Sequence, residues 1–109
     1  MFRDPNRQRL IRGTILQALY LNAFGVDAPV NIQDPYAMPR GVLARVLELS
    51  HVLPARSEMN AAVRYLQQKG YVEAVWDEDG EFTLVRLTTQ GMDLVEGNLK
   101  DPGVLLPRR

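Results

Sequence analysis

The pattern of hydrophobic and polar positions is clearest between residues 54 and 69. Pro54 suits a first helical turn, and Gly70 can take the left-handed conformation that ends a helix. Apolar side chains recur between them at helical spacing, at Met59, Ala62, Val63 and Leu66. This spacing predicts a helix that buries one face. The opposite face is polar and acid-free, and consists of Ser57, Asn60, Ala61, Arg64 and Gln68, with Arg56 and Gln67 at its borders.

A β-hairpin is predicted directly after this helix. Residues 71–76 continue as a strand, the acidic residues 77–80 turn the chain and end in glycine, and residues 81–87 return as the partner strand. Tyr71, Trp76 and Phe82 either stack on bases or a ligand or pack the sheet on the helices, and packing is the commoner role.

A long first helix is predicted from Pro5 to about Phe24, because Asp4 can cap its free amides. One apolar side contains Leu10, Ile11, Ile15, Ala18 and Leu19, and the other contains Leu16, Tyr20 and Ala23 or Phe24. Two apolar sides need two covering surfaces. The domain core covers one, and the C-terminal tail, a larger core or a second copy of the chain covers the other. In a homodimer, which we expect, the interface contains Leu16, Tyr20, Phe24, Leu105 and Leu106.

The segment between these helices is expected to hold a loop and a second helix. Residues 25–38 predict a loop, in which residues 30–32 are the candidate for a short first strand. Pro39 begins a helix that runs to about Leu49, and Val42, Val46 and Leu49 share one of its faces.

The chain closes with a short helix and a tail. Thr88 or Thr89 can cap the helix, and Gly97 ends it. The apolar residues 104–106 are expected to pack back on a helix, for which the second side of the first helix is a candidate. The 109 residues thus predict a single domain with a core at about residues 7–97 and a tail at residues 98–109.

Composition narrows the class of protein. The absence of cysteine excludes disulfides, thiolate metal sites and a cysteine nucleophile, and it fits a cytoplasmic location. The N-terminus lacks the apolar core of a signal peptide, and no apolar run approaches the roughly 20 residues that span a bilayer. We therefore expect a soluble protein without membrane contact.

Charge is balanced overall and uneven along the chain. The net charge is zero, whereas dedicated DNA-binding domains are usually basic. Residues 1–12 and residues 40–70 each carry a net charge of +3, and residues 71–81 carry −5. This distribution predicts a dipole with a basic helical side and an acidic hairpin.

Catalytic and metal-binding patterns are weak. The carboxylates at positions 77, 79 and 81 lack the register of a calcium loop, and His51 is the only histidine. The sequence contains neither a nucleophile elbow nor a glycine-rich phosphate loop. We therefore expect no enzyme activity, no metal and no cofactor.

Two motifs carry a resemblance to a known superfamily. Residues 63–72 resemble a frequent pattern in which a helix continues through Leu and two or three polar residues to Gly, and an aromatic or aliphatic residue and Val then begin a strand. Residues 87–91 resemble the Leu-Thr-x-x-Gly that follows the hairpin in small bacterial repressors. Together they resemble the winged helix-turn-helix superfamily, especially MarR-like and ArsR-like proteins, over about residues 7–97. The resemblance implies an α+β, mainly helical fold with a three-helix core, a two- or three-stranded wing and a short closing helix. Residues 88–97 and 101–104 also look like the end of small winged-helix proteins of Mu-like prophages.

The resemblance implies sequence-specific binding of double-stranded DNA by a bacterial or prophage transcriptional regulator. The third helix would enter the major groove, with Arg64 on guanine and Asn60 on adenine. Phosphates would be held by Ser57, Arg56, Arg40 and Arg45, and Ala61 and Gln68 share the DNA-facing side.

The acidic turn departs from this pattern, because DNA phosphates repel it. Either the hairpin points away from DNA, or it meets a protein, or the domain does not bind DNA. The alternative function is a winged-helix adaptor between proteins, for example in phage assembly. For DNA binding we expect the basic helix face to be open to solvent and turned away from the acidic hairpin. A face buried in the interior or covered by another subunit would exclude gene regulation.

Overall fold

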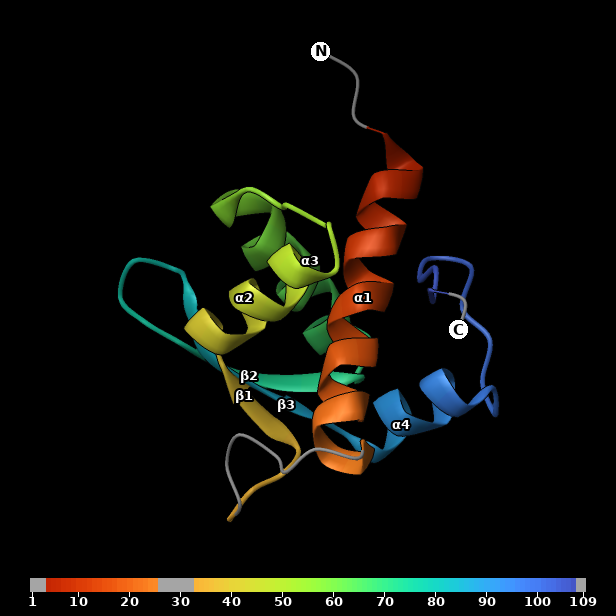
Figure 1. Cartoon of the computed structure of the whole chain (residues 1–109). Coiled ribbons are helices and arrows are strands. Elements are labelled where there is room, and N and C mark those ends of the chain that lie inside the picture. Colours follow the sequence, from red (N-terminus) through yellow and green to blue (C-terminus); the bar gives the residue numbers. More distant parts are fainter. Residues whose placement is uncertain (1–3, 26–32, 108–109) are drawn as a thin grey trace.

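The computed structural model describes residues 4–25 and 33–107. Within these ranges the chain is an α+β protein with four helices and one three-stranded antiparallel sheet. The elements are, in order, α1 (Pro5–Phe24), β1 (Ala37–Pro39), α2 (Arg40–Leu49), α3 (Arg56–Gln68), β2 (Val72–Trp76), β3 (Phe82–Leu87) and α4 (Thr89–Glu96). Figure 1 shows α1 beside α2 and α3, with the sheet below α2 and α3 and α4 next to the lower end of α1.

The helix ends follow the local signals in the sequence. The Asp4 carboxylate accepts a hydrogen bond from the Asn6 amide at 2.9 Å, so it caps α1 as predicted. Gly70 has a φ of 80° where the chain turns out of α3, and Gly97 has a φ of 87° at the end of α4. Both angles lie in the left-handed region that favours glycine. The Thr88 hydroxyl caps α4 by accepting from the Gly91 amide at 3.1 Å.

The first strand lies where a loop was expected. Ala37 and Met38 are 1% and 2% exposed and pair with Arg86 and Val85 of β3, so the sheet has the order β1-β3-β2. The prediction of a loop up to residue 38 is therefore wrong at its end. The segment carries too few residues for its own pattern to indicate a strand, and pairing with β3 decides its conformation. The candidate strand at residues 30–32 lies outside the described residues.

A β-bulge explains why the hairpin sequence does not alternate cleanly. Val75 pairs with Leu84, but Trp76 pairs with Phe82, so Thr83 is the extra residue of β3. The extra residue brings Phe82 to the same side as the buried Val85. Trp76 and Phe82 meet edge to face, with ring centroids 6.1 Å apart. Phe82 is fully buried and Tyr71 is 6% exposed, which confirms packing as their role.

The core lies between α1, α2, α3 and the sheet. The stripe predicted on α3 is confirmed, since Met59, Ala62, Val63 and Leu66 are all buried. On α2 the fully buried positions are Leu43 and Leu47, Val42 and Val46 are partly buried against the core, and Leu49 is 69% exposed. Leu49 follows Leu47 by two residues, about 200° around the helix, so it lies on the opposite side. In the described part of the chain, none of the helices is both long and apolar enough to cross a bilayer.

Leu16 belongs to the core. Its side chain is 0% exposed within this chain, so it cannot contact a second subunit, and its prediction as an interface residue is wrong. At Leu16 the second apolar side of α1 is covered by the chain itself. Of the three covers considered for that side, namely the tail, a larger core and a second copy, the larger core is the one found at Leu16.

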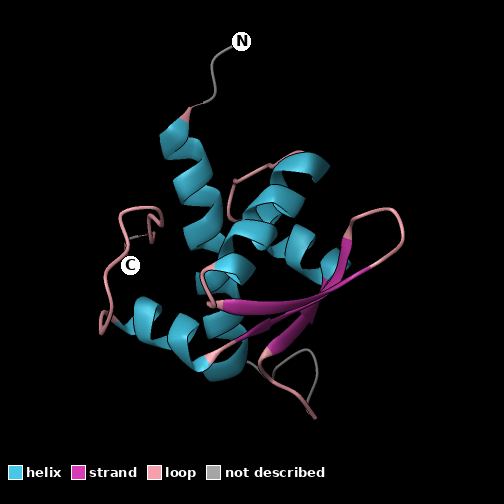
Figure 2. Cartoon of the chain, turned by 180° about the vertical axis from the view of Figure 1, so that it is seen from behind, coloured by secondary structure: helices cyan, strands magenta, loops and turns pink. Residues whose placement is uncertain are grey.

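The C-terminal tail packs back on α1, as expected. The Leu105 amide donates to the Arg9 carbonyl at 3.0 Å, and Val104 is 8% exposed. Figure 2 shows this segment beside α1 and α4 in the view from behind. A side chain at Gly13 would collide with the Leu105 carbonyl, so glycine in the middle of α1 permits this close approach.

Candidate functional site

The outer face of α3 is the exposed polar surface that the sequence predicted. Ser57, Ala61, Arg64 and Gln68 are exposed, while Asn60 is half-buried. Because the opposite face of α3 is buried in the core, the helix is held rigidly with these side chains outward.

The acidic hairpin lies against this face instead of pointing away from it. The Glu81 carboxylate lies 3.2 Å from Arg56 Nε and 3.8 Å from an Arg40 guanidinium nitrogen. The expectation that the basic face is turned away from the hairpin is therefore wrong. The 13 residues of α3 span about 20 Å and the five residues of β2 about 17 Å. Because Gly70 reverses the chain, the hairpin tip returns to the first turn of α3.

Asn60 joins three elements. Its amide oxygen accepts from Arg40 at 2.8 Å and from the Phe82 amide at 3.4 Å. Arg40 also donates to the Phe82 carbonyl at 3.2 Å and lies over the Phe82 ring. The oxygen that a bidentate pair with adenine requires is thus engaged inside the protein, and Asn60 links α3 to α2 and β3.

Arg64 is placed by the hairpin. Its guanidinium carbon lies 4.2 Å from the centre of the Trp76 ring, within the range of a cation–π contact. Trp76 Nε1 in turn donates to Gln67 Oε1 at 2.8 Å. A guanidinium nitrogen of Arg64 lies 3.5 Å from the Gly80 carbonyl, at the limit of a hydrogen bond. Arg64 remains exposed, so the edge of its guanidinium can reach a ligand.

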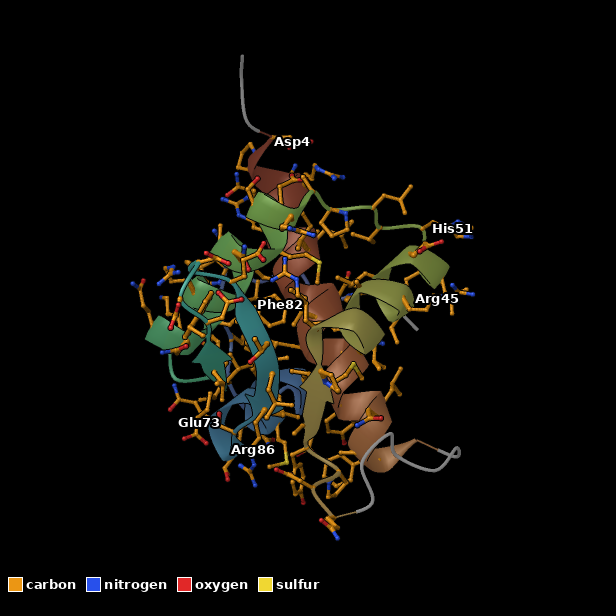
Figure 3. The ribbon with its side chains drawn as sticks, turned by 90° about the vertical axis from the view of Figure 1, so that its left-hand side faces the viewer. Asp4, Arg45, His51, Glu73, Phe82 and Arg86 are labelled. Carbon is orange, nitrogen blue, oxygen red and sulfur yellow. The ribbon has the colours of Figure 1, made fainter. Side chains whose placement is uncertain are left out.

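The predicted phosphate-binding residues do not all lie in one cluster. Arg40, Arg56, Ser57 and Asn60 surround the contact between α3 and the hairpin. Figure 3 shows Arg45 on α2 with His51 near it, both pointing away from the hairpin. Arg45 is therefore separate from the other predicted DNA-binding residues.

A hollow lies beside the contact between the first turn of α3 and the hairpin. It has a volume of about 670 Å³ and is lined by Ala55, Arg56, Ser57, Asn60, Asp79 and Glu81. Asp79 and Glu81 were not among the predicted site residues. The signal in the sequence was the short distance along the chain between α3 and the hairpin tip, since consecutive elements usually pack together.

The acidic turn is organised by its own backbone. Asp77 Oδ1 accepts from the Asp79 and Glu81 amides at 2.9 and 3.0 Å. Among the described residues, no group of three or more histidines, aspartates and glutamates lies together in a way that would hold a metal ion. Asp77 therefore shapes the turn.

The predicted interface residues lie at two places. Phe24 is 51% exposed at the end of α1, where its ring centroid is 4.9 Å from that of the half-buried Tyr20. Leu105 is 49% exposed, and its backbone lies beside Arg9 with the half-buried Leu106 next in sequence. Phe24 follows Arg9 by fifteen positions in the same helix, a rise of about 22 Å. Phe24 and Leu105 therefore do not form one patch.

A second polar cluster, which the sequence did not reveal, fixes the tail. The Tyr71 hydroxyl donates to Asp101 Oδ2 at 2.6 Å, and the Gly103 amide donates to Asp101 Oδ1 at 2.8 Å. Burial and this hydrogen bond raise the pKa of Tyr71 to about 12. The bond from Tyr71, helped by the Gly103 amide and the nearby Lys69, lowers the pKa of Asp101. The cluster serves the fold, because Asp101 faces inward with a side chain only 8% exposed.

Comparisons of the chain with protein-family models, with curated proteins and with solved structures found no match.

Proposed function

We propose that the chain is a winged helix-turn-helix protein that binds double-stranded DNA and regulates bacterial or prophage genes. The order of helices and strands and the sheet order β1-β3-β2 support this class. In it, α2 and α3 form the helix-turn-helix, and the β2–β3 hairpin is the wing.

The outer face of α3 is the observation that carries the proposal. A helix fits the major groove of B-form DNA, and an arginine can donate two hydrogen bonds to guanine. Arg64 is exposed on this face and oriented by the Trp76 ring. Ser57 and Arg56 at the first turn of α3 would contact phosphates.

The protein would act by occupying DNA, without a cofactor and without chemistry. Its net charge is zero, and Glu81 neutralises part of the basic surface. Sequence-independent attraction to phosphates is therefore small, and affinity depends more on base contacts than in a basic domain.

Arg64→Ala tests the proposal on a duplex selected from a random pool by the wild-type protein. If Arg64 reads a base, the variant loses ~1–3 kcal/mol of binding free energy and discriminates less at one position. Lys100→Ala is the matched control, because it removes an exposed positive charge in the tail. Equal affinities of the wild type and the Arg64 variant would reject the role of this face.

A protein adaptor is the second candidate. Leu49 and Leu53 are 69% and 66% exposed on the two sides of the turn between α2 and α3, which favours contact with another protein. Retention on a DNA column at about 50 mM salt, with elution as salt rises, supports DNA binding. Passage through the column without retention supports the adaptor.

A further inference from the structure

Glu81 occupies the position in which a bound phosphate would be expected. A carboxylate and a phosphate accept the same charge-assisted hydrogen bonds from arginine. Glu81 Oε1 lies 3.2 Å from Arg56 Nε and 3.8 Å from an Arg40 nitrogen, so two of the predicted phosphate-binding residues converge on one carboxylate oxygen.

We propose that Glu81 limits the sequence-independent affinity of the DNA interface, because its carboxylate competes with DNA phosphates for Arg40 and Arg56. This inference rests on the proposed function. Phosphate contacts supply the affinity that is independent of sequence. Arg64 lies on the Trp76 ring, outside the Glu81 ion pairs. Glu81 therefore weakens binding to random sequence and to the selected site by a similar factor, and leaves the base contact of Arg64 unchanged.

The ion pair between Arg56 and Glu81 is accessible to a phosphate from the side of Arg56. The Arg56 side chain is 74% exposed, and Arg56 and Glu81 both line the hollow beside the first turn of α3. An exposed ion pair is weak enough for a second anion to displace it. A DNA phosphate can thus take the place of the Glu81 carboxylate without any change of the fold.

The surroundings of Glu81 do not depend on its charge. Arg40 is also held by the Asn60 amide oxygen and the Phe82 carbonyl, at 2.8 and 3.2 Å. The backbone of Glu81 is held by Asp77, whose amide donates to the Glu81 carbonyl at 2.8 Å. Glu81→Gln should therefore free Arg56 and one nitrogen of Arg40, while Arg40 and the turn keep their positions.

The test compares Glu81→Gln with Glu78→Gln on a random-sequence duplex. Both variants remove one negative charge from the same turn, and Glu78 is exposed and forms no ion pair within the described part of the chain. Glu81→Gln should bind roughly 1.4- to fivefold more tightly than the wild type, the range that exposed ion pairs are worth. Its salt dependence should steepen by about 0.9 for each phosphate gained. A gain that is absent, or equal in the two variants, overturns the proposal.

A double-mutant cycle shows whether the effect passes through arginine. In an Arg56→Gln background the gain from Glu81→Gln should shrink, while the gain from Glu78→Gln should not change. Equal gains from Glu81→Gln in both backgrounds overturn the role of Arg56. If Glu81→Gln fails to fold by thermal melting, Glu81→Asp replaces it, because it keeps the charge but withdraws the carboxylate by one methylene.

Heparin separates this inference from the proposed function. It is a polyanion without bases, so later elution of Glu81→Gln than of Glu78→Gln from heparin supports competition at the arginines whether or not the chain binds DNA. If the wild type binds no duplex while this difference persists, the proposed DNA binding is rejected and the competition at the arginines still stands. If the two variants elute together, the competition is rejected, whatever the duplex result.

Discussion

At the residue scale, Asp101 shows how one side chain can hold a segment that has no secondary structure of its own. Its carboxylate accepts from Tyr71 and from the Gly103 amide, and Lys69 Nζ lies 3.8 Å away. Arg12 adds a bond to the Gly103 carbonyl at 3.1 Å. The tail is thus tied to the end of α3, to the residue before β2 and to α1.

Removal of the Asp101 charge should destabilise the fold. Asp101→Asn is expected to lower the free energy of unfolding at neutral pH by roughly 1–3 kcal/mol, since Tyr71 and Lys69 lose a charged acceptor. Because the pKa of Asp101 is lowered in the folded chain, its contribution is present above the unfolded pKa of about 3.9 and is lost as the pH falls through the folded value. Urea denaturation at several pH values should show a smaller acid loss in the variant. Asp79→Asn, at an exposed position, is the control, and an equal effect there would contradict the assignment.

Tyr71 should make the protein sensitive to alkali. Its pKa is raised to about 12 in the folded chain, from an unfolded value of 10.0. The contribution of Tyr71 to stability is therefore fully present below pH 10 and declines as the pH rises toward 12, because the unfolded chain releases the Tyr71 proton more easily. In Tyr71→Phe this decline, measured by urea denaturation across the same pH range, should be smaller. An unchanged decline would assign it to other groups.

At the element scale, α1 and the tail depend on a glycine. Glycine costs about 1 kcal/mol in a helix interior relative to alanine. The cost at Gly13 is offset by packing, because the tail backbone at Leu105 lies where a side chain would project. Gly41 of α2 differs, since a side chain there would meet nothing within 4 Å.

The two glycines give predictions of opposite sign. Gly13→Ala should destabilise the protein by about 1–3 kcal/mol, because the tail must move. Gly41→Ala should stabilise it by up to about 1 kcal/mol through helix propensity. Urea denaturation measures both. Stabilisation by Gly13→Ala would mean that the tail does not rest on α1 in solution.

At the scale of the whole molecule, the tertiary structure cancels the expected dipole locally. The basic start of α2 and α3 meets Glu81 of the acidic hairpin, and Arg86 of β3 lies within 4 Å of Asp34 and Glu73, at 3.2 and 3.7 Å. The charges that are segregated along the chain are interleaved in space. Long-range attraction to DNA should accordingly be weak, and recognition should depend on short-range contacts.

The proposed homodimer makes a prediction for the end of α1. Phe24 is half-exposed and contacts the Tyr20 and Tyr36 rings, with centroids 4.9 and 5.8 Å away, so it is an ordered apolar surface. If it forms the interface, Phe24→Glu should convert a dimer into a monomer in sedimentation equilibrium. Leu53→Glu, at a comparably exposed leucine in the turn between α2 and α3, should leave the dimer intact. A monomeric wild type would reject the homodimer.

The sequence by itself determined the features that are local. Asp4, Gly70 and Gly97 marked helix ends correctly, since capping and a left-handed φ depend on a few neighbouring residues. The stripe of α3 was also legible, because 13 residues of regular spacing define a buried face.

Only the tertiary structure decided which distant residues meet. Met38 became a strand residue because β3 offers it a partner, and Leu16 was buried by other parts of the same chain. The contact between Arg40 and Glu81 joins residues 41 positions apart, and nothing in either neighbourhood specifies it. Such contacts are set by how helices and strands of given lengths pack around a common core, and a local pattern carries no information about that arrangement.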